Sequence, residues 1–185
     1  QGMEKAHSWS VDGHKTLNTP YDSGILLCRD KSALVTALQA SGAYLTSNYS
    51  EKRDGMMYTP EMSRRARAVE LWAALKYLGK AGVDELVYGL HKRADQFAHA
   101  LKQAGFTVHN NVVFNQVIVS PSDDDETTLA VLAQIQASGE CWVGSSIWEG
   151  KAVIRISVCS WATTSEDIRR SALAFISARD VICGK

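Results

Sequence analysis

Proline, long apolar runs and an excess of charge of one sign are scarce or absent in this sequence. Only three of its 185 residues are proline and 22% are charged, a composition that argues against intrinsic disorder. Twenty basic side chains balance twenty acidic ones, which argues against a nucleic-acid binder that relies on bulk positive charge. Every apolar run falls short of the roughly 20 residues that a membrane-spanning helix needs. We therefore expect a folded domain with no nucleic-acid or membrane partner.

Cysteine is also sparse, and its spacing matches no metal site. The four cysteines lie at positions 28, 141, 159 and 183, without a CxxC pair. Three of them lie in apolar stretches, which predicts buried, reduced thiols rather than disulfides and favours a cytoplasmic location. The start of the chain lacks the apolar core of a signal peptide, and residues 1–2, before Met3, are typical of the remnant of a cleaved tag.

Residues 1–60 show short strand patterns and one long aperiodic stretch. We predict strands over 7–11 and 24–28, the second of the buried type, with a polar loop over 12–20 between them. Asp30 can cap a helix that continues to about residue 40. Residues 41–60 follow no period, and a connection of this length in a compact domain is typically a functional lid. A disordered surface loop is the alternative interpretation.

Helical patterns dominate the middle of the chain and strand patterns return at its end. Apolar residues at helical spacing predict long helices over 61–79 and 83–104, punctuated by glycines. From residue 105 the order is strand, strand, helix, strand, strand, helix, which favours a four-stranded sheet with helices on one face. Thr163 and Glu166 fit a capping box at the start of the last helix.

The residues most suggestive of chemistry surround Lys15. This lysine follows a predicted strand and comes directly after Asp12, Gly13 and His14. A lysine in a tight loop at a strand end suits imine chemistry when its surroundings activate the amine. An ordinary surface lysine is the simpler interpretation of Lys15 taken alone. Residues 13–16 are not a phosphate-binding loop, because the first glycine of that motif is absent.

A longer segment around this lysine carries a family signature. Residues 12–24 read Asp-Gly-His-Lys-Thr-Leu-Asn-Thr-Pro-Tyr-Asp-Ser-Gly. The segment resembles the Schiff-base segment of the group II pyridoxal-phosphate-dependent decarboxylases, the aromatic-L-amino-acid and glutamate decarboxylase family. Three further features agree with that family in order and spacing: its loop tyrosine at Tyr44, its S-R-R…W helix at 63–72, and its closing G-K…R…T-T-x-D-I segment at 150–168. The resemblance covers residues 6–182.

The resemblance implies a role for each of five residues and no metal. Lys15 is similar to the lysine that binds pyridoxal 5'-phosphate (PLP) covalently, and His14 to its neighbour that contacts the cofactor phosphate. Asp12 stands beside them, where the family often has asparagine. Tyr44 resembles the residue that returns a proton to the substrate α-carbon after carbon dioxide leaves. Arg155 resembles the arginine that binds the substrate carboxylate, a contact suited to a planar guanidinium.

Some of these residues also admit plainer interpretations. Tyr44 fits an ordinary loop aromatic, and Arg155 fits a structural ion-pair partner within its strand. A basic group at the start of the first long helix fits either an anion site or a solvated or packing face, and it consists of Arg64, Arg65 and Arg67.

The resemblance further implies a fold and a division of the chain. The implied fold class is α/β, as the C-terminal portion of a fold type I PLP-dependent transferase-like enzyme. Residues 3–60 correspond to the end of the PLP-binding large domain, with the lysine loop and the lid-like loop. Residues 61–104 correspond to connecting long helices, and 105–185 to a ferredoxin-like α+β small domain.

The implied function is decarboxylation of an L-amino acid by a homodimeric parent enzyme. Family members carry an earlier part of the large domain, which supplies a ring that stacks on the cofactor and an acidic partner for its pyridine nitrogen. We therefore expect the 185-residue chain by itself to be inactive. A non-catalytic remnant or a ferredoxin-like binding module is the alternative.

Overall fold

The computed structural model describes residues 2–38 and 54–184 and divides the chain into two compact units. The first unit covers residues 1–76 and the second covers residues 77–185. The division lies inside the region expected to connect two domains, so each unit carries part of the long helical segment. Of the expected tag remnant at residues 1–2, residue 1 lies outside the described residues.

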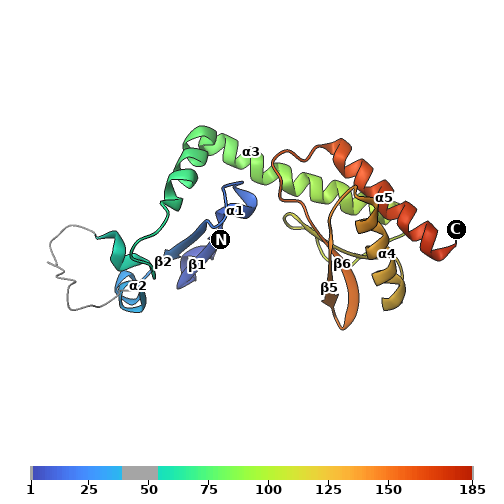
Figure 1. Ribbon diagram of the computed structural model, residues 1–185, viewed down its shortest axis with the longest axis horizontal. Helices are drawn as coiled ribbons and strands as arrows, with labels where there is room; N and C mark the ends of the chain where they lie inside the picture. The colour runs from blue at the N-terminus through green and yellow to red at the C-terminus, as the bar shows by residue number, and fades with distance from the viewer. Residues whose placement is uncertain (1, 39–53, 185) are drawn as a thin grey trace. The chain divides into compact units, whose positions relative to one another are not determined.

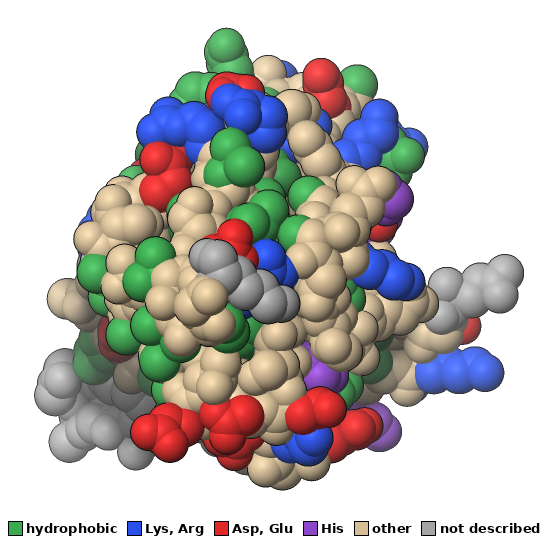
Figure 2. Space-filling model, turned by 90° about the vertical axis from the view of Figure 1, so that its right-hand side faces the viewer, with side chains coloured by type: hydrophobic (Ala, Val, Ile, Leu, Met, Phe, Trp, Pro, Cys, Tyr) green, Lys and Arg blue, Asp and Glu red, His purple; other side chains and the backbone are tan. Residues whose placement is uncertain are grey.

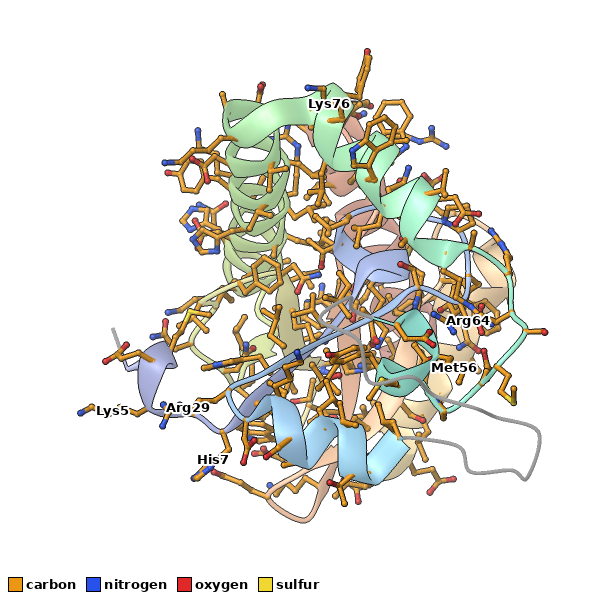
Figure 3. All side chains as sticks on the ribbon, turned by 90° about the vertical axis from the view of Figure 1, so that its left-hand side faces the viewer. Lys5, His7, Arg29, Met56, Arg64 and Lys76 are labelled. Atoms are coloured by element: carbon orange, nitrogen blue, oxygen red, sulfur yellow. The ribbon has the colours of Figure 1, made fainter. Side chains whose placement is uncertain are left out.

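The first unit is built on a two-stranded antiparallel ribbon. Strands β1 (Ser8–Asp12) and β2 (Gly24–Cys28) pair so that Asp12 lies opposite Gly24. At the far end of the ribbon the amide of Arg29 donates a hydrogen bond to the carbonyl of His7 (3.0 Å), and Figure 3 shows these two labelled residues near each other. Both predicted strands are confirmed, each within one residue of its expected bounds. Besides α2 (Lys31–Leu38) and the start of α3 (Arg67–Gln103), the described part of this unit contains three short helices: η1 (Met3–Lys5), α1 (Gly13–Thr16) and η2 (Gly55–Tyr58) (Figure 1).

Two expectations about this unit are wrong in detail. The predicted loop over 12–20 begins with the helical turn α1, because the chain folds back on itself there: Gly13 donates its amide to the Ser23 carbonyl (2.8 Å) and accepts from the Thr19 amide (3.3 Å). β2 is not a buried strand, since Leu26 and Leu27 are exposed. A two-stranded ribbon has no inner strand, so neither of its strands is covered by neighbours on both sides.

Helix α2 (Lys31–Leu38) begins where the sequence predicted it. Asp30 caps the helix, because its Oδ1 accepts hydrogen bonds from the amides of Ser32 (2.8 Å) and Ala33 (3.1 Å). The Ser32 hydroxyl also donates to Asp30 Oδ1 (2.7 Å). This bond is the largest cause, ahead of the two amide bonds, that holds the pKa of Asp30 below its ordinary value. The expected continuation to residue 40 and the lid-like loop over 41–53 lie outside the described residues.

The long helical segment α3 (Arg67–Gln103) contains a break at Gly79. This glycine has φ 62° and ψ −176°, a conformation that only glycine adopts easily. The prediction of two helical stretches separated near Gly79 is therefore confirmed. The expected start at residue 61 is wrong, because Arg64 folds back to hydrogen-bond the Thr59 hydroxyl (2.6 Å) and the Glu61 carbonyl (3.0 Å). A helical turn over 61–65 would need that carbonyl for its own ladder.

The second unit contains the predicted four-stranded sheet, and all of its strand pairs are antiparallel. Its strand order is β3-β4-β6-β5, and the β4-α4-β5-β6-α5 run follows the β-α-β-β-α order of a ferredoxin-like fold. A ferredoxin-like fold has a last strand after its second helix. Here β3, which precedes β4 in the sequence, takes that edge position in the sheet. The elements are β3 (Thr107–Val108), β4 (Gln116–Ser120), α4 (Asp125–Ser138), β5 (Gly144–Trp148), β6 (Lys151–Ser157) and α5 (Ser165–Cys183).

The core of this unit lies between one face of the sheet and three helical segments. Figure 1 shows α4 and α5 on one side of β5 and β6. The ring of Phe175 on α5 meets the edges of two other rings, Phe97 at 5.4 Å and Phe106 at 6.0 Å between centroids. The predicted arrangement of helices on one face is confirmed. The fully buried residues come from α3, β4, α4, β6 and α5, and include Leu101, Val117, Val119, Val131, Ile135, Ile154 and Phe175.

The four cysteines are all free thiols, as predicted, but they are not buried as expected. Cys28 and Cys141 are half-buried, whereas Cys159 and Cys183 are exposed. Cys159 follows the end of β6 and Cys183 lies in the last turn of α5, so neither side chain faces the core. Desolvation raises the pKa of the Cys141 thiol.

Charge and hydropathy of the surface agree with the composition. Figure 2 shows Lys and Arg side chains interspersed with Asp and Glu on one face of the molecule. Within the part of the chain that the structure describes, no helix is both long and apolar enough to cross a membrane.

The cap of α5 is shifted by one residue from its predicted position. Thr164, not Thr163, is the N-cap, and its partner is Asp167 rather than Glu166. The Asp167 amide donates to the Thr164 hydroxyl (3.2 Å), and the Thr164 amide donates to the Asp167 carboxylate (2.8 Å). Both threonines stand three residues before an acid, so the local sequence pattern does not distinguish them.

We expect Thr164→Ala to destabilise the second unit by about 1 kcal/mol, the usual cost of losing an N-cap side chain. Thr163→Ala is the matched control and should change the free energy of unfolding by less than about 0.5 kcal/mol. Urea unfolding followed by circular dichroism measures both. An equal loss in the two variants, or a larger loss for Thr163→Ala, contradicts the observed cap.

Candidate active site

Lys15 lies in the helical turn α1, directly after strand β1. Its Nζ atom donates a hydrogen bond to Oδ2 of Asp12 at 2.6 Å, and the two side chains are 60% and 40% exposed. The hydrogen bond from Lys15 holds the pKa of the Asp12 carboxyl below its ordinary value. The structure thus brings together two of the predicted site residues at the end of β1, with the lysine amine held by a carboxylate.

His14, the residue before the lysine, has one ring nitrogen fixed by the backbone. The Ser23 amide donates a hydrogen bond to His14 Nδ1 (3.1 Å). Nδ1 also lies 3.2 Å from the Ser23 carbonyl, which accepts from the Gly13 amide at 2.8 Å. Because an amide can only donate, we assign Nδ1 as the acceptor and place the ring proton on Nε2. His14 therefore has an Nε2–H donor for an acceptor such as a phosphate oxygen.

The turn that carries these residues is tightly packed under Gly13. A Cβ atom at this position would lie 2.8 Å from the Ser23 hydroxyl oxygen and 3.0 Å from that of Thr19. Both Thr19 and Ser23 are buried, and the Thr19 hydroxyl has no hydrogen-bond partner among the described residues. Any side chain at the start of α1 would therefore displace the buried Ser23 and Thr19 side chains.

We expect Gly13→Ala to destabilise the first unit by about 1–3 kcal/mol, the usual cost of overpacking a filled site. Gly24→Ala is the matched control, because a Cβ atom there would meet nothing within 4 Å. Amide NMR signals of residues 8–28, followed through a urea titration, measure the change. Equal stability of the two variants would show that the turn is looser than the contacts indicate.

The three arginines before and at the start of α3 bind protein groups rather than form an open anion site. Arg67 donates to both carboxylate oxygens of Asp22, with Nη2 at 3.0 Å from Oδ2. Arg65 donates to the Tyr21 carbonyl (2.9 Å) and pairs with Glu70. The alternative of an anion site is therefore not supported, since acidic side chains and carbonyls already surround two of the guanidinium groups.

Arg155 lies in the second unit, in the middle of strand β6. Its neighbours across the sheet are Ile118 on β4 and Gly144 on β5. The side chain is exposed, and within the described residues no hydrogen bond or ion pair ties it to another group. The alternative of a structural ion-pair partner finds no support among the described residues.

The predicted proton donor Tyr44 lies outside the described residues, together with most of the lid-like loop. The described end of that loop, η2, begins after Asp54, whose Oδ1 accepts from the Met56 amide (3.1 Å). The structure therefore describes four of the five predicted site residues. Three of these, Asp12, His14 and Lys15, are consecutive or nearly so, and the fourth, Arg155, belongs to the other unit.

Comparison with known proteins decides the family. The sequence profile of the pyridoxal-dependent decarboxylase conserved domain matches residues 1–120. The chain belongs to this family. The match includes the whole lysine segment over 12–24, on which the resemblance was recognised.

Named members of the decarboxylase family match most of this chain but a minor part of their own length. Tyrosine decarboxylase 2 of Narcissus pseudonarcissus is 26% identical over 181 residues, which cover 92% of this chain and 36% of the relative. L-2,4-diaminobutyrate decarboxylase of Rhizobium meliloti (strain 1021) is 24% identical over 180 residues, with the same coverage of 92% and 36%. The chain thus spans little more than a third of the relatives that it matches.

Solved structures share the fold of this decarboxylase-family chain. The crystal structure of Oryza sativa TDC with PLP and tryptamine matches with a TM-score of 0.89 at 22% identity, over 98% of this chain and 40% of that chain. Sphingomonas wittichii serine palmitoyltransferase matches with a TM-score of 0.71 at 15% identity, over 99% and 42%. These likenesses confirm the predicted fold class, the C-terminal portion of an α/β fold type I enzyme.

Sequence reasoning missed the residues that hold the lysine turn in place. Ser23 fixes His14, and Tyr21 and Asp22 receive the two arginines. All three belong to the segment that carries the family signature, so the signal was present. Their partners could not be identified, because Arg65 and Arg67 lie more than 40 residues away in the sequence.

Proposed function

We propose that Lys15 is the residue to which PLP is attached, in an enzyme that removes the α-carboxylate of an L-amino acid. The observation that carries the proposal is the arrangement at the end of β1, where a lysine amine, a carboxylate and a histidine of fixed tautomer meet in one tight turn. Membership of the pyridoxal-dependent decarboxylase family supports the reaction class.

The residues of the turn fit the chemistry of PLP. The cofactor aldehyde needs a primary amine, which Lys15 supplies, and its phosphate needs hydrogen-bond donors, of which His14 Nε2–H is one. The tight packing of Gly13 against Thr19 and Ser23 holds the backbone that carries both side chains. Lys15 would hold the cofactor covalently, while His14 and Asp12 would adjoin it.

Each residue has a task in the proposed reaction. Bound PLP supplies an electron sink for the electron pair released when the carboxylate leaves as carbon dioxide. Lys15 would supply the primary amine that holds the cofactor, once that amine is released from the Asp12 carboxylate that now accepts its hydrogen bond. The Arg155 guanidinium binds and orients the substrate carboxylate through two parallel hydrogen bonds. The Tyr44 hydroxyl returns a proton to the substrate α-carbon.

The substrate class is an L-amino acid. Relatives with comparable identity are named for different substrates, tyrosine in Narcissus pseudonarcissus and L-2,4-diaminobutyrate in Rhizobium meliloti. Tyrosine has an aromatic side chain and 2,4-diaminobutyrate a basic one, so the groups that the two amino acids share are the α-amino and α-carboxylate groups. Those two groups are the ones that Lys15, through the cofactor, and Arg155 would recognise.

Mapping the site of PLP attachment tests the proposal. The chain has ten lysines, and after incubation with PLP and reduction with borohydride we expect the label on Lys15 in preference to the other nine. Peptide mass spectrometry gives the distribution. A label spread evenly over the exposed lysines would overturn the assignment and favour a binding module that has kept the fold without the chemistry.

We further infer that the 185-residue chain by itself releases no carbon dioxide from amino acids. Lys15 is 60% exposed, so water reaches the amine, whereas the reaction requires a site from which water is excluded. Release of labelled carbon dioxide from carboxyl-labelled tyrosine and 2,4-diaminobutyrate measures the activity. Turnover above that of free PLP would contradict this inference.

We also propose that the chain forms a homodimer in the cytoplasm. The free thiols support a reducing compartment.

Support for the homodimer comes from the β1–β2 ribbon, where large apolar side chains are exposed on both faces, namely Trp9, Val11, Leu26 and Leu27. Light scattering over a hundredfold range of concentration should give twice the chain mass of 20.3 kDa. A monomer at every concentration would exclude the dimer.

A further inference from the structure

A second group of residues lies behind the lysine turn and ties it to α3. Arg67 donates two hydrogen bonds to the Asp22 carboxylate. Arg65 donates one to the carbonyl of Tyr21, which directly precedes Asp22 in the sequence. The two arginines thus hold consecutive residues of the loop between α1 and β2. All of these residues belong to the first unit.

The anchored loop contacts the site through an aromatic ring. The Tyr21 ring packs against the His14 ring with centroids 4.1 Å apart and an interplanar angle of 35°. Tyr21 is 71% exposed, so burial does little to fix its position. Its ring is held by the backbone that carries it, and that backbone is held by Arg65 and Arg67.

We propose that Arg67, assisted by Arg65, is a positioning residue for the PLP lysine turn. By holding Tyr21 and Asp22, the two arginines keep the Tyr21 ring against the His14 ring and so help to set the orientation of the His14 Nε2–H. The inference rests on the proposed function, because it assigns a purpose to a contact of the proposed cofactor site. Each guanidinium also meets a second acid, Glu70 for Arg65 and Glu61 for Arg67 (3.2 Å), but Arg67 carries more of the effect because it binds both carboxylate oxygens of Asp22.

The electrostatics of the pair agree with a local rather than a global role. The Arg67 guanidinium holds the pKa of the Asp22 carboxyl below its ordinary value, and Asp22 raises that of Arg67. Exposed ion pairs contribute little to overall stability. A bidentate arginine–carboxylate contact nevertheless fixes direction, because both groups are planar and meet along two bonds. Removing it should therefore disturb the geometry of the loop and leave the fold intact.

Two measurements on the full chain test the proposal. The first is the NMR chemical shift of the His14 ring protons, assigned with His14→Gln, which reports the ring current of Tyr21. The second is the initial rate of PLP attachment to Lys15, trapped with borohydride and mapped by mass spectrometry. Arg67→Ala should move the His14 signals toward those of Tyr21→Leu and slow attachment about tenfold, the scale of losing an outer positioning contact at a functional site.

Arg64→Ala is the matched control. Arg64 precedes the other two arginines in the sequence, but its hydrogen bonds go to Thr59 and Glu61 and not to the loop. It should change neither measurement. Arg67→Lys, which keeps the charge but loses the two-bond contact, should give an intermediate shift. Asp22→Ala combined with Arg67→Ala should have no larger effect than either change alone, because both remove one contact.

The outcomes separate this inference from the proposed function. Unchanged His14 signals in both Arg67→Ala and Asp22→Ala, with circular dichroism showing a folded chain, would overturn the positioning role. An equal shift with Arg64→Ala would do the same, since it would point to a general loosening. If the wild-type chain shows no preference for Lys15, the proposed function fails, while the His14 signals still decide whether the arginines place the Tyr21 ring.

Discussion

Replacing Lys15 with alanine is expected to abolish the specific attachment of PLP to this chain. Among the described residues of the turn, the Lys15 amine is the group that can form a covalent bond with the cofactor aldehyde, because Asp12 and His14 offer no primary amine. Without that bond the cofactor would depend on a few polar contacts in an exposed turn. Association costs roughly several kcal/mol of free energy in lost translational and rotational freedom, and a few exposed polar contacts scarcely offset that cost.

The absorbance band of the bound cofactor measures this effect directly. The band should be absent in Lys15→Ala, and mass spectrometry after borohydride reduction should find only background labelling on the remaining lysines. Lys15→Arg is the companion variant, because it keeps a cation beside Asp12 but has no nucleophilic amine. It should lose the band as completely as alanine does. A cofactor spectrum that survives in either variant refutes the assignment of Lys15.

Replacing Phe175 with alanine is expected to have the largest effect on stability. The Phe175 side chain is 0% exposed and lies at the centre of the second unit, against the edges of Phe97 and Phe106. A buried phenylalanine replaced by alanine typically costs about 3–5 kcal/mol, because transfer energy is lost and a cavity remains. Domains of this size have a free energy of unfolding of only about 5–15 kcal/mol. The variant should therefore lose a large fraction of the stability of this unit.

The neighbouring Leu173 provides the control for this prediction. It lies two residues earlier on α5 and is 48% exposed, so Leu173→Ala should cost less than about 1 kcal/mol. Urea unfolding followed by circular dichroism compares the two variants with the wild type. A similar loss in both would show that α5 does not present Phe175 to the core in the way described.

The sequence by itself determined those features that depend on neighbouring residues. The strand over 24–28, the cap at Asp30 and the break at Gly79 were predicted because each follows from side chains within a few positions. The lysine segment over 12–24 could be recognised for the same reason, since its signature is contiguous. The order of strands and helices after residue 105 was sufficient to predict a sheet with helices on one face.

Only the tertiary structure decided features that depend on residues distant in the sequence. Thr163 and Thr164 carry equivalent cap patterns, and only the structure shows that Thr164 is the N-cap. The tautomer of His14 follows from the Ser23 amide, which the turn brings back to the ring. Arg67 meets Asp22 across 45 positions, and no local pattern of charge indicates that pair. Local propensities act over a few residues, whereas these contacts require the path of the whole chain, so the sequence identified the lysine and the fold identified what holds it.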